Sequence, residues 1–92
     1  MLPQKQANLS IISAIAACDY TLMRASAARL EMLACEVTAT LRSHHAPPIL
    51  SAVIDHAARQ LRDAVSLGTA QESHARYLAN ALDVALAWVE SH

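Results

Sequence analysis

The sequence predicts an all-α protein, a bundle of three helices, on the strength of three observations. Alanine and leucine recur at helical spacing along almost all of the 92 residues. Strong interruptions are few, namely the Pro47-Pro48 pair and the single glycine, Gly68. The chain is long enough for one hydrophobic core, so we expect a single domain over residues 1–92.

The first periodic segment, residues 8–43, is predicted to form one long helix. Asp19 lies near the centre of its apolar stripe, where an unpaired carboxylate is costly. Two interpretations of Asp19 stay open. It caps a second helix, so that the segment bends near Cys18, or it points into a polar pocket between helices. At about 100° per residue the stripe contains Ile12, Ile15, Ala16, Met23, Ala27, Leu30, Leu33, Ala34, Val37 and Leu41.

The other two helices have clear start and stop signals. The proline pair predicts the start of the second helix, because proline is favoured in a first helical turn. Gly68 provides the left-handed residue that ends it. Thr69 and Glu72 have the spacing of a capping box and predict the start of the third helix, which continues to the C-terminus. Its apolar arc approaches about 200°, wider than one packing contact needs.

The unequal lengths of these helices predict a homodimer. A first helix of about 35 residues would span about 50 Å, whereas the other two would span about 30 Å each. Two short helices cannot cover one long helix, so a second subunit must cover the overhang unless the segment bends near Asp19. We expect the dimer, with these interface residues: Leu30, Leu33 and Val37 on the first helix and Tyr77, Val84 and Trp88 on the third.

Composition argues against several function classes. The seven Lys and Arg residues nearly balance the eight Asp and Glu residues, so no basic surface is available for nucleic acid. The five histidines lack the convergent spacing of a metal site, and we expect neither a metal nor a cofactor. No stretch reaches the roughly 20 apolar residues that span a membrane.

The two cysteines are predicted to be free thiols. Cys18 and Cys35 would lie about 25 Å apart along one helix, whereas a disulfide requires Cα atoms within about 7 Å. Reduced thiols favour a cytoplasmic protein. The alternative is an exported lipoprotein attached through Cys18, because Ile15-Ala16-Ala17-Cys18 resembles a bacterial lipoprotein box.

Parts of the chain resemble the small helical chorismate mutases of the AroQ class. Ile15 and Asp19 match that family's Ile-x-x-x-Asp stretch. Arg29, ten residues after Asp19, falls where the family keeps an arginine that binds a substrate carboxylate. The stretch from Ser66 to Tyr77 resembles the turn into the family's third helix. The resemblance implies a dicarboxylate site whose ligand-binding residues would be Arg29, Arg42 and His56.

The chain departs from that family at most catalytic positions. Ile12 stands where a second arginine is expected, and Thr40 and Leu41 stand near the lysine of the first helix. His56 and Ala57 replace an arginine and a glutamate of the second helix. Holding a dianion in a dry pocket requires several cations, so the resemblance implies a non-catalytic relative.

We therefore predict a small non-enzymatic interaction protein: a dimeric regulator, adaptor or chaperone subunit that presents an apolar helix surface to a partner helix. Bacterial secretion co-chaperones share this size and composition. The alternative is a chorismate-mutase-like enzyme or dicarboxylate-binding relative. An enzyme needs Arg29 turned inward with a second cation in reach, whereas an interaction protein has Arg29 exposed and an apolar patch near Trp88.

Overall fold

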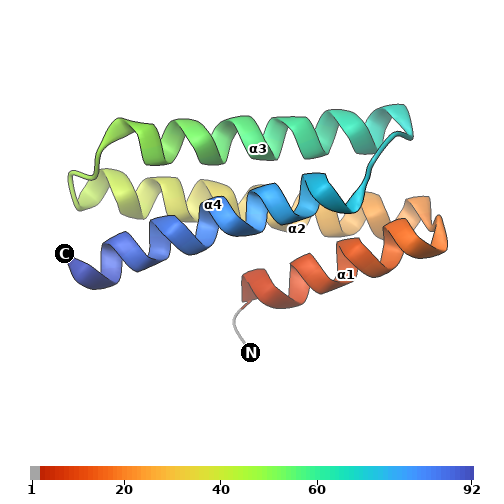
Figure 1. The fold of residues 1–92 in the computed structure, drawn as a ribbon, viewed down its shortest axis with the longest axis horizontal. Helices are drawn as coiled ribbons and strands as arrows, with labels where there is room; N and C mark the ends of the chain where they lie inside the picture. Colours follow the sequence, from red (N-terminus) through yellow and green to blue (C-terminus); the bar gives the residue numbers. More distant parts are fainter. Residues whose placement is uncertain (1–2) are drawn as a thin grey trace.

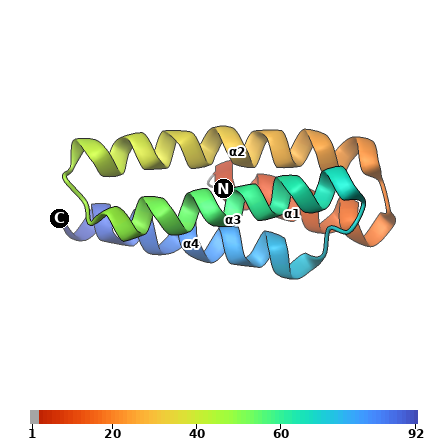
Figure 2. The ribbon, with the colours of Figure 1, turned by 90° about the horizontal axis from the view of Figure 1, so that it is seen from above.

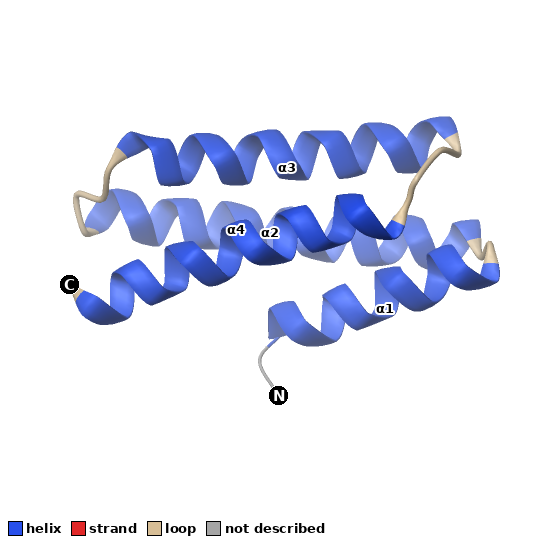
Figure 3. Ribbon diagram, viewed as in Figure 1, coloured by secondary structure: helices blue, strands red, loops and turns tan. Residues whose placement is uncertain are grey.

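In a computed structural model, the described part of the chain forms four helices joined by short turns (Figures 1 and 3). The structure describes residues 3–92, and the side chains of residues 9–92. Within that range every regular element is a helix. The predicted count of three helices is wrong, because the first periodic segment forms two helices. The elements are α1 (Pro3–Ala17), α2 (Tyr20–Ser43), α3 (Pro48–Leu67) and α4 (Glu72–Ser91).

The break between α1 and α2 lies at Cys18 and Asp19, where one of the two interpretations of Asp19 placed it. Cys18 has a φ of 55°, in the left-handed region. The Cys18 N–H donates to the Ile15 carbonyl at 3.2 Å and the Asp19 N–H to the Ala14 carbonyl at 2.9 Å, which is the Schellman pattern that ends a helix. The Asp19 carboxylate then accepts the Leu22 N–H at 3.1 Å. Asp19 is therefore the N-cap of α2, the first of its two interpretations.

Because of this break, α1 folds back and packs against α2 and α4. Ile11 and Ala14 of α1 are completely buried in the shared core. Leu30 of α2 is also buried, at 1% exposure, within the chain itself. The helix that was expected to project beyond its neighbours is thus covered in part by the chain's own N-terminal segment. Figure 1 shows α1 running beside only part of the bundle.

The proline and glycine signals are confirmed, and the capping box lies elsewhere. Pro48 occupies the first turn of α3, and Gly68 ends that helix with a φ of 72°. The Thr69 N–H still completes the end of α3 by donating to the Ala64 carbonyl at 2.8 Å, so α4 begins later than predicted. In place of the predicted Thr69–Glu72 box, the Gln71 N–H donates to Nδ1 of His74 at 3.0 Å, and the Gln71 side chain accepts the His74 N–H.

The core is built from leucine, isoleucine and many alanines. Figure 2 shows α2 and α4 on either side of α3, with α1 behind them, so α1 and α3 cover opposite sides of the α2 and α4 pair. Small side chains allow the helices to approach closely. The largest completely enclosed side chains are Ile11, Leu30, Leu41, Ile54, Leu61, Leu78 and Leu82.

Candidate functional site

The three residues suggested by the chorismate mutase resemblance are exposed and lie apart. Arg29 and Arg42 are thirteen residues apart on α2. That spacing corresponds to about 20 Å along the helix axis, and the two side chains leave it on different sides. His56 is on α3, where its ring meets the ring of Tyr77 edge-on at a centroid distance of 6.2 Å. The fold therefore does not place these three residues in one pocket.

An apolar groove lies between α3 and α4. Its volume is about 240 Å³, and no charged residue lines it. Ile49 and Val84 stand at its edges with 64% and 57% of their surfaces exposed, while Ala81 is buried. The polar groups along it are the Asn80 amide and the Tyr77 hydroxyl. The lining residues are Ile49, Leu50 and Val53 from α3 and Tyr77, Asn80, Ala81 and Val84 from α4.

Helical spacing explains how the sequence builds this groove. Ile49 and Val53 are four residues apart on α3, and Tyr77 and Val84 are seven apart on α4, so each pair shares one face of its helix. These two faces line the groove together, and Ile49 and Val84 on them remain largely exposed. Adjacent exposed apolar side chains make this surface a candidate binding site.

The predicted interface residues are only partly in this groove. Tyr77 and Val84 line it. Trp88, one turn beyond Val84, packs half-buried against the core and stacks on the His92 ring with centroids 4.3 Å apart. Ile49, which also lines the groove, was not among the predicted interface residues. The available signal was an apolar residue directly after the proline pair, in the first turn of a predicted helix. Of the three other predicted interface residues, Leu30 is buried in the core of the chain itself, and Leu33 and Val37 are half-buried against that core.

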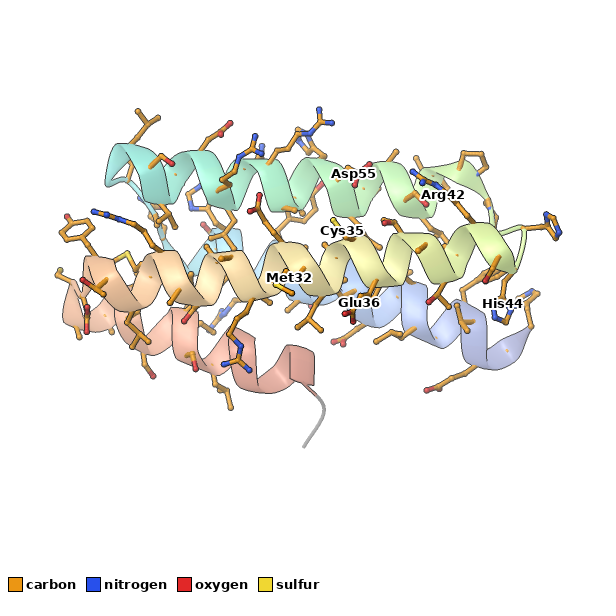
Figure 4. All side chains as sticks on the ribbon, turned by 180° about the vertical axis from the view of Figure 1, so that it is seen from behind. Met32, Cys35, Glu36, Arg42, His44 and Asp55 are labelled. Carbon is orange, nitrogen blue, oxygen red and sulfur yellow. The ribbon has the colours of Figure 1, made fainter. Side chains whose placement is uncertain are left out.

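A second, wider groove runs between α2 and α3 on the face that Figure 4 shows. Its volume is about 670 Å³. Small side chains, Ala28, Cys35 and Ala58, line it together with Met32, which is 66% exposed. Arg62 of α3 spans the two helices, with 3.6 Å between its Nη1 and Oε1 of Glu31. Other charged residues along this groove are Glu36, Asp55 and Arg59.

The remaining chemistry of the described residues is sparse. Cys18 and Cys35 are exposed free thiols, as predicted. Across the part of the chain with described side chains, no three His, Cys, Asp or Glu residues are grouped closely enough to hold a metal ion. Nor does any described helix have the length and apolar character needed to cross a membrane.

Comparisons with known protein families, with curated protein sequences and with solved structures found no match to this chain. The α3–α4 groove and the α2–α3 groove are therefore interpreted from their own geometry and chemistry.

Proposed function

We propose that this protein is a non-enzymatic interaction module that binds an amphipathic helix of a partner protein in the α3–α4 groove. The observation that carries the proposal is the groove's uncharged lining together with the exposure of Ile49 and Val84 at its edges. Helix-in-groove recognition uses large apolar side chains spaced three, four and seven residues apart along the bound helix.

The chemistry of the groove defines the partner's face. Each large aliphatic side chain that the partner buries there contributes roughly 1.5–3 kcal/mol. Because association itself costs about 4 kcal/mol or more, several such side chains are needed for measurable binding. A charged side chain at the same position would lose its hydration without gaining an ion pair, because no charge lines the groove. The partner helix therefore presents leucine, isoleucine or similar residues on one face and carries its charges elsewhere.

The chorismate-mutase-like alternative has less support. It requires Arg29 and a second cation at one site, and the fold keeps Arg29, Arg42 and His56 exposed on separate surfaces. A role as a regulator, an adaptor or a chaperone subunit agrees with the groove. The helix-length argument for a homodimer no longer applies, because the first segment bends and α1 packs against α2.

A selection from displayed helical peptides tests the groove. Peptides without tryptophan are selected against the wild-type protein, and binding is followed through the fluorescence of the single tryptophan, Trp88, one turn from Val84. We expect selected peptides with apolar residues at helical spacing. Val84→Glu or Ile49→Glu should weaken their binding at least about tenfold. Both positions are exposed, so neither change disturbs the core.

Leu67→Glu is the matched control, because Leu67 is 76% exposed at the far end of α3. It should leave peptide binding unchanged. The proposal fails if no helical peptide is selected, or if the selected peptides bind Val84→Glu and Ile49→Glu as tightly as the wild type.

A further inference from the structure

α2 has a second apolar face that points away from the core. Its inward face is occupied by residues such as Leu30 and Leu41, each 1% exposed. A helix on the outside of a bundle needs only one apolar face. The outward face nevertheless repeats apolar residues at alternating spacings of three and four, the a/d pattern of a coiled coil. This outer seam consists of Ala25, Ala28, Met32, Cys35 and Ala39, all exposed.

Met32 makes this seam more than a row of small residues. It is the one large side chain in the seam, 66% exposed, and hollows lie on both sides of it. On one side is the α2–α3 groove, where Ala28, Cys35 and Ala58 leave room. On the other is a shallower hollow of about 150 Å³ that Met32 lines with Arg29, Leu33 and Glu36. A projecting side chain next to a recess on one surface is what a two-fold symmetric contact requires.

We propose that the outer seam of α2 is a homodimer interface, in which the α2 helices of two copies pack antiparallel about a two-fold axis. Met32 of each copy enters the α2–α3 groove of the other and packs against Cys35 there. Figure 4 shows Met32, Cys35 and Glu36 along α2 on this face. In Figure 1, which is the opposite view, α4 lies in front of α2, so the α3–α4 groove stays accessible in the dimer.

Charges beside the seam select the antiparallel direction. The flanking coiled-coil positions of α2 hold Arg24, Arg29, Glu31 and Glu36. In a parallel pair, Arg24 would face Arg29 of the second copy, and Glu31 would face Glu36, so both contacts would repel. In the antiparallel pair, Arg29 faces Glu36 of the second copy, and the symmetry axis repeats this attractive contact.

The same charges select the register. Sliding the antiparallel pair by one heptad would place Arg29 against Arg29 and Glu31 against Glu31 of the second copy. The complementary register instead puts the two-fold axis between Met32 and Cys35. It pairs Ala28 with Ala39 of the second copy, where two small side chains allow close approach. Glu31 is already oriented toward Arg62 of its own chain.

Light scattering on the full chain provides the first test. The wild type should have twice the single-chain mass of 9.9 kDa, and Met32→Glu should have the mass of one chain. Val84→Glu is the matched control, because it places the same charge on an exposed aliphatic position of α4 and should leave the dimer intact. A wild type that remains a single chain at every concentration overturns the proposal, as does a Met32→Glu variant that remains a dimer.

A charge exchange tests the direction and register. Arg29→Glu alone and Glu36→Arg alone should each weaken the dimer, and the double variant Arg29→Glu/Glu36→Arg should restore it. Failure of the double variant to recover contradicts the antiparallel register.

The rate of thiol alkylation is a third test, in which Cys18 serves as an internal control. Dimerisation should slow modification of Cys35 and leave that of Cys18, at the α1–α2 turn, unaffected. Equal protection of both thiols counts against the seam.

This proposal is independent of the α3–α4 groove. Met32→Glu should bind selected helical peptides as the wild type does, and Val84→Glu should lose peptides while remaining a dimer. These variants can therefore disprove the peptide-binding proposal and the dimer proposal independently.

Discussion

Two turns of this molecule end a helix with the same pair of hydrogen bonds, and they differ in the residue that makes the turn. At the end of α3, Gly68 donates to the Val65 carbonyl and the next N–H reaches the Ala64 carbonyl. At the end of α1, the Cys18 N–H donates to the Ile15 carbonyl, and the Asp19 N–H donates to the Ala14 carbonyl. Gly68 has a φ of 72° and Cys18 a φ of 55°.

The comparison shows that a helix can be ended by packing as well as by its local sequence. Glycine adopts a left-handed φ without steric strain, whereas another residue loses roughly 1–2 kcal/mol there. At the α1–α2 turn, two contributions offset that cost. One is the Asp19 cap, about 1 kcal/mol, and the other is the burial of side chains such as Ile11 when α1 folds back.

The largest predicted effect tests whether packing maintains the α1–α2 break. Ile11→Ala should lower the free energy of unfolding by about 2–5 kcal/mol, because Ile11 is completely buried and its removal leaves a cavity. Leu9→Ala, two residues earlier at 54% exposure, should change it by less than about 0.5 kcal/mol. Urea denaturation followed by circular dichroism measures both. If α1 instead continued α2 as a straight helix, Ile11 would be exposed and the two variants would behave alike.

The next prediction concerns the glycine turn. Gly68→Ala should destabilise the protein by about 1–2 kcal/mol, because alanine must then adopt the left-handed φ. Steric crowding does not add to this loss of stability, since a Cβ at position 68 would lie 3.8 Å from the nearest atoms of Tyr20, an ordinary van der Waals distance. Cys18→Ala is the matched substitution in the other turn. It should be nearly neutral, because it exchanges one exposed non-glycine residue for another. Equal losses at the two positions would contradict the comparison.

The Asp19 cap should have an effect of about 1 kcal/mol. Asp19→Ala removes the acceptor for the Leu22 N–H and should destabilise the protein by about that amount. Asp19→Asn keeps an acceptor oxygen and should retain most of the stability. Thermal unfolding of the three proteins measures the difference. If Asp19→Asn were as destabilised as Asp19→Ala, the carboxylate would act through its charge and not through this hydrogen bond.

The fold could be predicted wherever the sequence carried a local signal. Pro48 and Gly68 mark helix ends through their own backbone geometry, and the structure confirms both. Cys18 carries no such signal, so the first segment was predicted as one long helix, and a break at an Asp19 cap remained only an open alternative. The capping box was misplaced for a related reason. Thr69 was assigned to α4, but its N–H completes the end of α3.

The residues of the candidate sites could also be predicted only where the signal lay within one helix. Tyr77 and Val84 could be identified from the wide apolar arc of one helix, because periodicity depends on that helix alone. The groove also needs Ile49, which lies on a different helix, and periodicity within one helix cannot predict which residues of another helix lie beside it. The outer seam of α2 required knowing which face of that helix is inward. The apolar stripe indicated that face, and Leu30 and Leu41 of the stripe are buried. The seam itself was not identified, because all of its residues except Met32 have small side chains.

The smallest predicted effect is a gain in stability at the cysteine turn. Cys18→Gly should stabilise the protein by less than about 1 kcal/mol, since glycine removes left-handed strain but loses more conformational entropy on folding. The gain is smaller than the Gly68→Ala loss, because the Cys18 φ of 55° lies close to the left-handed minimum of about +57°. His45, also at a φ of 55°, ends α2 with the same two bonds. His45→Gly should therefore give a similar gain. A loss of stability in Cys18→Gly would mean that the Cys18 side chain contributes to the turn beyond its backbone conformation.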